Sequence, residues 1–348
     1  MHGFIRRRAS VMAPLPRFCA ALGVMGGVAW AVTFGTASWA AGAQAAYPER
    51  SIRLIVPFAA GSAADTLSRV VASALSDELG QPLVVDNKGG AGGTIGTVDI
   101  ARAKPDGYTL GIAAQGTFVN NQVLYKSPGY DSIKDFTFIS EIADVQNLLV
   151  VDTKSPYQDA PSLLAAIKAK PAETFRYSSS GVGTSHHIAG ATVAQMLNKP
   201  LLHVPYTGAP QGLGAIISGD VDMGLYNLPA AIGLVRGGKL RALAVTGPKR
   251  STLLPDVPTM QESGLTNYSV TLWWGLVGPA GLPANVSTRL HAALDKVMSQ
   301  PALRDKLIGQ GFTLPDTPLP KPAAFEALVR QDLAKWVPVL KELGTAAQ

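Results

Sequence analysis

Cysteine is nearly missing from this chain, whose only copy, Cys19, lies within the first 46 residues. The rest of the sequence therefore offers no disulfide, no thiolate nucleophile and no cysteine ligand for a metal. A chain of this kind tolerates an oxidising compartment, because it has no thiols that could mispair there. Cys19 follows Pro-Arg-Phe and comes too early in the sequence to be a lipoprotein cysteine.

A clustered basic surface is also missing. The chain carries 30 Lys and Arg against 24 Asp and Glu, but four of the cations and none of the acids lie in residues 1–46. The remainder has a formal charge of only +2, so the basic pI comes largely from the N-terminal segment. Nucleic-acid-binding proteins usually concentrate Lys and Arg on one face, and we therefore expect no nucleic-acid partner.

Long apolar runs are absent after residue 46, and the segment before it has the pattern of an export signal. Residues 6–8 and Arg17 are basic, and no charged residue occurs from Phe18 to Pro48. The apolar stretch 22–34 is short for a membrane span, which needs about 20 apolar residues. Residues 43–45 read Ala-Gln-Ala, a small-x-small cleavage site. We predict a cleaved signal peptide over residues 1–45 and a soluble periplasmic protein, with an uncleaved anchor as the alternative.

Short apolar runs alternate with helical patterns through the rest of the chain. This alternation is typical of an α/β protein with a mainly parallel sheet, and about 300 residues suffice for two domains of about 150. The predicted strands are residues 52–57, 83–85, 109–113, 147–151, 175–178, 201–204, 221–226, 240–245 and 268–277. The predicted helices are residues 65–79, 94–103, 160–169, 184–197, 209–218, 229–236, 283–298, 301–309 and 321–343.

The stretch 52–79 indicates how a ligand could be bound. A buried-type strand runs into a loop of small residues, 58–65, and then into an amphipathic helix. Asp65 stands where an N-cap is expected. Because the loop has few side chains, main-chain N–H groups at the helix start are open to a ligand. A helix N-terminus carries about half a positive charge and favours an anion.

The stretch 175–197 repeats this arrangement. A strand enters a polar turn ending at Gly181, and a helix follows with Thr184 or Ser185 as its cap. The two turns lie about 120 residues apart, and ligands of open α/β sheets bind at the carboxyl ends of strands. We therefore expect two lobes that face one anionic ligand.

Other motifs favour structural interpretations over catalytic ones. The glycine-rich loop 88–96 fails the G-x-G-x-x-G spacing, so a tight loop against the other lobe is preferred to a nucleotide site. Ser185 lies near a nucleophile-elbow pattern, with His203 or His291 as a base, but a helix cap explains it better. His186 and His187 are adjacent and cannot share a metal as i,i+4 ligands do, and either could contact a ligand. The adjacent residues Trp273 and Trp274 point to opposite faces of a strand, one into the core and the other free to close over a ligand.

The sequence resembles the substrate-binding receptors of tripartite tricarboxylate transporters, also called Bug-type proteins. The resemblance runs in order from residue 47 almost to the end of the chain. It rests on Tyr47-Pro with Ile52–Phe58, Gly61 and Asp65, on Gly90–Gly96, Ala101–Leu110, Tyr177–Gly181, His203–Tyr206, Gly219–Met223, Gly238–Thr246, Leu254–Thr259 and Gly275–Gly281.

This resemblance implies a two-lobed periplasmic binding protein of type II, the Venus-flytrap kind, with each lobe a mixed, mainly parallel sheet flanked by helices. It implies lobe 1 over residues 46–146 and 269–348, and lobe 2 over residues 147–268, with crossings near Gln146 and Tyr268. The ligand of this family is typically a small carboxylate, held by one loop from each lobe through main-chain N–H groups and water. The partners are two integral membrane permease subunits, while some members act as ligand sensors.

The chain departs from the family pattern at three places. Ser62 stands where the family often has glycine, Thr207 where a lysine is common, and Tyr226 where an aspartate is common. These changes leave the far end of the ligand unassigned.

We therefore predict a monomeric solute-binding protein for a small organic anion, without a cofactor or metal and without enzymatic activity. A sensor for a two-component system and a serine hydrolase using Ser185 are the alternatives. The predicted ligand-binding residues are Phe58, Gly61, Ser62, Ala63, Asp65, Gln115, Thr117, Ser179, Ser180, Gly181, Thr184, Ser185, Tyr206 and Asn227.

Overall fold

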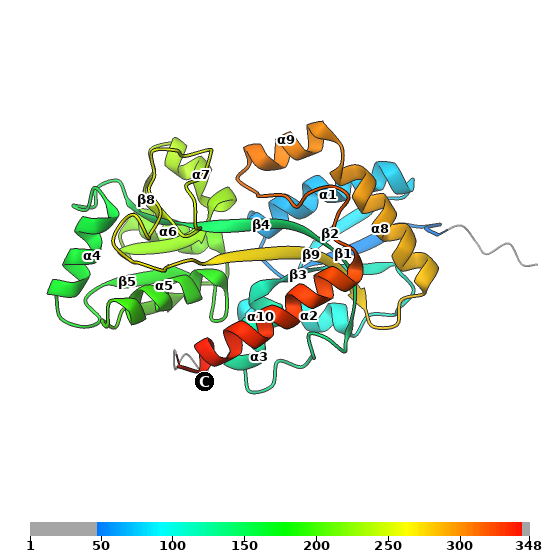
Figure 1. The fold of residues 1–348 in the computed structure, drawn as a ribbon, viewed down its shortest axis with the longest axis horizontal. Helices are drawn as coiled ribbons and strands as arrows, with labels where there is room; N and C mark the ends of the chain where they lie inside the picture. The colour runs from blue at the N-terminus through cyan, green and yellow to red at the C-terminus, as the bar shows by residue number, and fades with distance from the viewer. Residues whose placement is uncertain (1–46, 343–348) are drawn as a thin grey trace, which may run out of the picture. The chain divides into compact units, whose positions relative to one another are not determined.

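A computed structural model describes residues 47–342 (Figure 1). The predicted signal peptide lies outside the described residues. Within them, nine strands join in the order β2-β1-β3-β9-β4-β7-β5-β6, and β8 pairs with β4. Residues 47–342 contain no helix with the length and apolarity needed to cross a membrane.

The first lobe is built on strands that follow one another with helical connections. Its strands are β1 (Ile52–Val56), β2 (Leu83–Asn87) and β3 (Thr109–Ala114), and β1 pairs in parallel with both others. Its helices are α1 (Ala63–Leu79), α2 (Thr94–Ala101), α3 (Asn121–Leu124), α8 (Ala284–Met298) and α9 (Pro301–Gly309), with a 3₁₀ turn at Ala91–Gly93 and a π-helix at Gly116–Asn120. The core of this lobe packs α1 and α8 against the sheet through apolar side chains such as Leu67, Leu75 and Leu290.

One long strand, β4, runs through both lobes. Strand β4 (Phe136–Asp152) pairs antiparallel with β9 (Thr271–Pro279) up to Gln146 and then pairs with β7 and β8 from Asn147 onward. The sequence predicted only residues 147–151 of β4, so its first half was missed. Two register shifts interrupt the pairing between residues 138 and 143, and such bulges break the alternation on which strand prediction depends.

The second lobe repeats the strand–helix alternation. Its strands are β5 (Arg176–Ser179), β6 (Leu202–Pro205), β7 (Met223–Asn227) and β8 (Leu240–Val245), and β5 pairs in parallel with β6 and β7. Its helices are α4 (Ala160–Ala169), α5 (Ser185–Met196), α6 (Ala209–Ser218) and α7 (Leu228–Arg236). The predicted α/β class with two lobes of mixed sheet is confirmed, with antiparallel pairing where β4 and β9 meet their neighbours.

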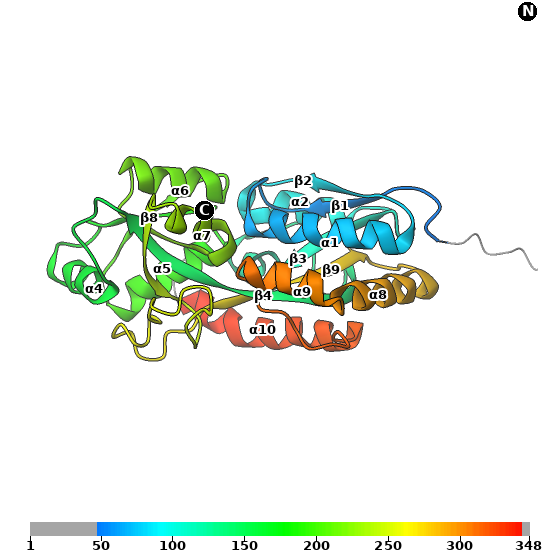
Figure 2. The same cartoon turned by 90° about the horizontal axis from the view of Figure 1, so that it is seen from above.

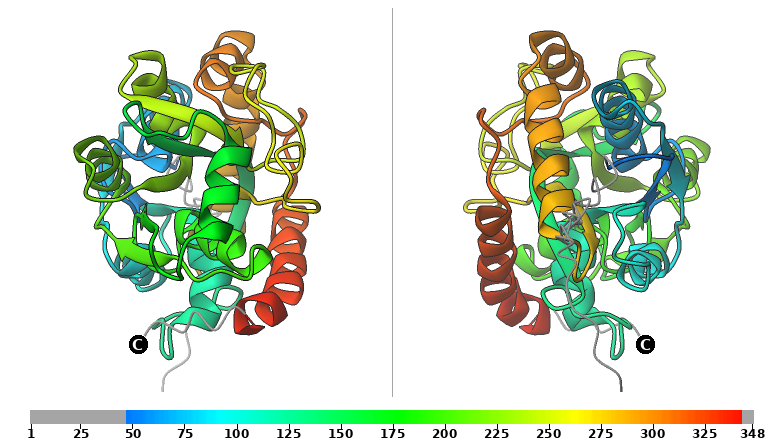
Figure 3. Two further views of the ribbon diagram at one scale, coloured as in Figure 1. Left: turned by 90° about the vertical axis from the view of Figure 1, so that its left-hand side faces the viewer. Right: turned by 90° about the vertical axis from the view of Figure 1, so that its right-hand side faces the viewer.

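The two faces of β9 are covered by different helices. Leu272, Trp274 and Leu276 belong to the core under α1 and α8, whereas Trp273 packs edge-on against Phe325 of α10 (Pro322–Glu342). Figures 2 and 3 show α10, in red, on a different side of the molecule from α1, in blue. This alternation decides which of the two adjacent tryptophans can face a ligand.

The N-cap predicted for α1 was wrong. Ser62, not Asp65, caps α1: its side chain accepts the Asp65 N–H, and its backbone is extended. Asp65 lies in the first turn, where its carboxylate accepts the N–H of Gly61. The two side chains thus satisfy two main-chain donors at the helix start, as in a capping box.

Candidate functional site

A cavity lies between the lobes and has no charged lining residue. It encloses about 540 Å³ of empty space, including its opening to solvent. The lining residues are Pro57, Phe58, Ala59, Ser62, Ala64, Gly90, Gly93, Ala114, Gly116, Ser180, Thr184, Ser185, His186, Thr207, Gly208, Ala209, Asn227, Leu272 and Trp274. The first lobe supplies a mostly apolar wall, and the second lobe supplies most of the polar side chains.

The start of α1 forms one edge of the cavity through Ser62 and Ala64. The N–H of Gly61 is already bound, at 2.9 Å, by the Asp65 carboxylate. The N–H groups of Ala63 and Ala64, the first two of the helix, have no partner among residues 47–342. The donors that remain at this edge therefore belong to Ala63, which was predicted from the sequence, and to Ala64, which was not.

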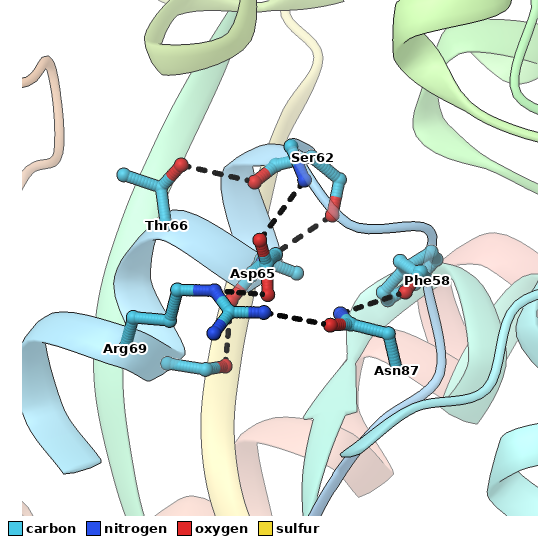
Figure 4. A network of polar contacts seen from close by, with 9 residues as sticks. Phe58, Ser62, Asp65, Thr66, Arg69 and Asn87 are labelled. Carbon is cyan, nitrogen blue, oxygen red and sulfur yellow. Dashed lines mark hydrogen bonds and ion pairs between the residues drawn. The ribbon is translucent and has the colours of Figure 1, made fainter. Parts of the chain in front are cut away.

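A polar network behind this edge fixes the loop (Figure 4). Arg69 pairs with Asp65 at 3.0 Å and donates to Asn87 Oδ1 at 3.0 Å, and Asn87 donates to the carbonyl of Phe58 at 3.1 Å. Burial alone would raise the pKa of Asp65, but the bonds from Arg69 and Gly61 outweigh it and hold that pKa below its usual value. Asp65 therefore stays charged and positions the loop, outside the cavity lining.

The start of α5 forms the opposite edge. Thr184 caps the helix by accepting the His187 N–H, and its hydroxyl donates to Gly181 O at 2.7 Å. The N–H groups of Ser185 and His186 have no partner among the described residues. Thr184, Ser185 and His186 all line the cavity, so this helix presents two donors and its dipole to the same space as α1.

His186 and Asn227 join α5 to the start of α7 at the cavity wall. The two ring nitrogens of His186 lie 2.9 Å from Ser180 Oγ and 3.0 Å from Asn227 Oδ1. Burial lowers the pKa of His186 to about 4, so the ring is neutral at pH 7. Asn227 Nδ2 also donates to Asn147 Oδ1 at 2.6 Å. The side chains on this wall are therefore fixed in place before any ligand arrives.

A third helix start, missed by the sequence reasoning, also reaches the cavity. Gly208 is the N-cap of α6, and Thr207, Gly208 and Ala209 line the cavity. Strand β6, Gly208 and the proline at the second helical position form the same strand–turn–helix pattern as the other two sites. That pattern could have identified this third edge. Its helix had been predicted with the right bounds.

The predicted residues divide into two groups. Phe58, Ser62, Ser180, Thr184, Ser185 and Asn227 line the cavity. The others, which do not line it, are Gly61, Ala63, Asp65, Gln115, Thr117, Ser179, Gly181 and Tyr206. Of this second group, Gln115 pairs with Asn120, Thr117 donates to Ala114 O, and Gly181 and Tyr206 line a neighbouring cavity of the cleft.

Ser179 lies behind the second edge rather than in the lining. It is fully buried, and its hydroxyl accepts the Gly181 N–H at 3.0 Å and lies 2.6 Å from His203 Nε2. His203 stacks on His187, whose Nδ1 accepts the Gly183 N–H at 3.3 Å. Burial lowers the pKa of His203 to about 4 and that of His187 to about 3, so both rings are neutral at pH 7.

The partners of Ser185 differ from those of an activated nucleophile. Its hydroxyl accepts a bond from Asn227 Nδ2 at 3.4 Å. The histidines considered as bases are engaged elsewhere: His203 with Ser179, and His291 with the carbonyl of Ile139 at 3.1 Å. A nucleophile needs a base within hydrogen-bond reach, and neither histidine contacts Ser185 here.

The lobes touch beside the cavity. Asn120 Nδ2 donates to Gly183 O at 2.9 Å, and Tyr125 donates to Val182 O at 3.2 Å. A Cβ placed on Gly92 would lie 2.1 Å from Val182 O, so only glycine permits this approach. The glycine-rich loop therefore packs tightly against the other lobe, as predicted.

Comparisons with known proteins identify relatives over most of the chain. The family described as "Tripartite tricarboxylate transporter family receptor" matches residues 67–345. A "UPF0065 protein in tcbD-tcbE intergenic region" of Pseudomonas sp. (strain P51) is 34% identical over 320 residues, covering 92% of this chain and 93% of the relative.

Solved structures also match this chain over most of its length. The periplasmic binding protein BugD is 33% identical with a TM-score of 0.82, covering 87% of this chain and 100% of that one. Rpa4515 of R. palustris, solved with adipate, is 31% identical with a TM-score of 0.82, covering 86% and 99%. MatC of Rhodopseudomonas palustris, solved with malate, is 28% identical with a TM-score of 0.80, covering 84% and 100%.

Proposed function

The chain belongs to the tripartite tricarboxylate transporter receptor family, and from this premise we propose that it captures a small organic carboxylate in the cavity between its lobes and delivers it to a membrane transporter. The observation that carries the proposal is the meeting of three helix N-termini, those of α1, α5 and α6, at one cavity without charged side chains. Each helix start favours negative charge through its unpaired N–H groups and its dipole.

The chemistry of the lining favours binding over reaction. A carboxylate placed here receives neutral main-chain donors from rigid elements, and such charge-assisted bonds contribute about 1.5–3 kcal/mol each. Ser185, the candidate nucleophile, hydrogen-bonds to Asn227 instead of a base. The relatives solved with adipate and malate support a carboxylate as the ligand class. The protein acts in this proposal as a binding protein and not as a hydrolase.

The location and partners follow from the family and from the N-terminal sequence. We propose a periplasmic protein whose residues 1–45 are a cleaved signal, with two permease subunits as partners. Lobe 1 comprises residues 46–146 and 269–348, and lobe 2 comprises residues 147–268. The change of partners in β4 between Gln146 and Asn147 supports the first boundary. The sensor alternative uses the same ligand-bound form.

A backbone substitution tests the proposal directly. Ser185 is the first residue of α5, and Thr184 before it is extended (φ −66°, ψ 158°), which is the conformation required before a proline. Ser185→Pro removes the N–H from the cavity without breaking the helix, since proline is tolerated at the first helical position. We expect adipate, malate or the best carboxylate of a thermal-shift screen to bind about tenfold to a hundredfold more weakly by calorimetry.

Two further variants serve as controls. Ser185→Ala removes only the hydroxyl and should change affinity by less than threefold. Ala284→Pro also places a proline at the first position of a helix, here at the exposed start of α8 and outside the cavity, and should leave affinity unchanged. Equal affinity of Ser185→Pro and Ala284→Pro for the carboxylate would contradict the proposed site. A wild-type protein that binds no carboxylate would contradict the proposed function.

A further inference from the structure

The indole N–H of Trp274 is a buried donor that lacks an acceptor. The residue is 2% exposed and lines the cavity between the lobes. Within residues 47–342, nothing accepts a hydrogen bond from its Nε1. Buried polar groups are almost always hydrogen-bonded in folded proteins, because a buried donor has given up its bond to water. A ligand in the cavity could supply the missing acceptor.

The neighbouring Trp273 provides an internal comparison. Successive residues of a strand point to opposite faces, so Trp273 lies under α10, away from the cavity. Its Nε1 donates to Asp332 Oδ2 at 2.8 Å. Of these two adjacent indoles, one therefore has its acceptor within the protein, whereas the other lines a cavity and has no acceptor among residues 47–342.

The surroundings of Trp274 indicate what kind of acceptor would fit. Leu272 lies on the same face of β9 and also lines the cavity, while Phe312 packs edge-on with ring centroids 5.9 Å apart. A carboxylate placed on this apolar wall would exchange its water for one neutral donor, which is unfavourable for a charge. A carbonyl or hydroxyl oxygen is far easier to desolvate. The charged end is better placed at the helix starts, where several N–H groups converge.

We propose that Trp274 binds the ligand directly by donating its indole N–H to an uncharged oxygen of the ligand. The ligand class is a small monocarboxylate whose apolar part carries a carbonyl or hydroxyl group. Trp274 thereby selects such acids over their deoxygenated counterparts. This inference rests on the proposed function, since it assigns the carboxylate to the N-termini of α1, α5 and α6.

Matched pairs of acids test this selection. The probes are 4-oxopentanoate with pentanoate, and 4-hydroxybenzoate with benzoate, measured by calorimetry. We expect the oxygen-bearing member of at least one pair to bind about three- to tenfold more tightly, as suits one neutral hydrogen bond. Trp274→Phe should abolish that difference. Trp273→Phe, which alters the same strand outside the cavity, should preserve it.

Nuclear magnetic resonance of the indole groups gives a second readout that needs no folded Trp274 variant. The Trp274 resonance is assigned by elimination with Trp273→Phe and Trp336→Phe, in protein lacking residues 1–45. The oxygen-bearing acid should shift the Trp274 indole proton downfield and leave the Trp273 proton in place.

The outcomes separate the two hypotheses. If carboxylates bind while the resonance of the Trp274 indole proton does not shift, this inference is overturned and the proposed function is left intact. The same conclusion holds if wild type and Trp274→Phe prefer the oxygen-bearing acid of each pair to the same extent. If none of these acids binds, and adipate and malate do not bind either, both this inference and the proposed function are overturned.

Discussion

At the scale of single residues, the second edge of the cavity depends on side chains that do not line it. Ser179 accepts the N–H of Gly181, and His203 lies 2.6 Å from the Ser179 hydroxyl. His187 accepts the N–H of Gly183. Both glycines have positive φ values, of 114° and 86°, so the turn needs this support to keep one conformation. Ser179 and the two histidines are therefore positioning residues for the helix start at Ser185.

Replacing Ser179 tests this support. Ser179→Ala removes the acceptor of the Gly181 N–H and should weaken carboxylate binding by about three- to tenfold, the equivalent of one hydrogen bond. Ser178→Ala is the matched control, because Ser178 is equally buried but bonds to Gly212 and Tyr226, away from the turn. Calorimetry with one carboxylate measures both. Equal losses in the two variants would show that Ser179 has no special role in the turn.

At the scale of elements, β4 carries a pair of acidic side chains beside the point where it passes between the lobes. Burial, with the repulsion of neighbouring carboxylates, raises the pKa of Glu141 and of Asp144 above their usual values. Asp332 of α10 contributes to this repulsion at both residues. A raised pKa in the folded state means that the protonated form is favoured there. The pair therefore favours folding below the unfolded pKa values and loses this contribution as pH rises through the folded ones.

The variant Glu141→Gln should reveal this effect. It removes one charge of the pair, so we expect a melting temperature several degrees above wild type at pH 8 and a clearly smaller difference at pH 5. Differential scanning calorimetry at the two pH values measures it. Asp316→Asn, at an exposed position, should change neither value. A wild-type protein equal to Glu141→Gln at pH 8 would show that the carboxylate of Glu141 carries no cost when ionised.

Elements with local start and stop signals could be predicted closely from the sequence. Helix α4 begins after the N-cap Asp159, and α6 ends at Gly219 in the left-handed conformation, so both have the bounds that were expected. The first half of β4 could not be predicted, because its bulges remove the alternating pattern. The cap of α1 was misplaced because Ser62 and Asp65 are both good caps, and only the backbone conformation distinguishes them.

The candidate site likewise has features that local sequence patterns predict and features that depend on distant parts of the chain. Two of its three helix starts were identified from strand–turn–helix patterns, which are local. Trp274 could not be distinguished from Trp273, because alternation assigns them to opposite faces without saying which face meets the other lobe. Ser179 was taken for a cavity residue, since its burial under His203 depends on a strand 24 residues away.

At the scale of the whole described molecule, ligand binding and contact between the lobes involve the same loop. Val182 and Gly183 of the second lobe accept hydrogen bonds from Tyr125 and Asn120 of the first. The turn that carries these carbonyls leads directly into α5. A ligand held by α1 and α5 therefore favours the conformation in which these contacts form, and the contacts in turn favour binding.

The substitution Gly92→Ala tests this coupling. A methyl group there would lie 2.1 Å from the carbonyl oxygen of Val182, so the lobes could not approach, and we expect carboxylate affinity to fall at least tenfold. Gly80→Ala is the matched control: Gly80 has a similar φ of 70°, against 60° at Gly92, but open space around its Cβ position. Both variants should lose similar stability from the strained backbone, about 1 kcal/mol, because alanine is disfavoured at positive φ. Calorimetric affinity and the melting temperature of the empty protein measure the two effects separately. If the affinities of Gly92→Ala and Gly80→Ala were the same, ligand binding would not require the two loops to meet.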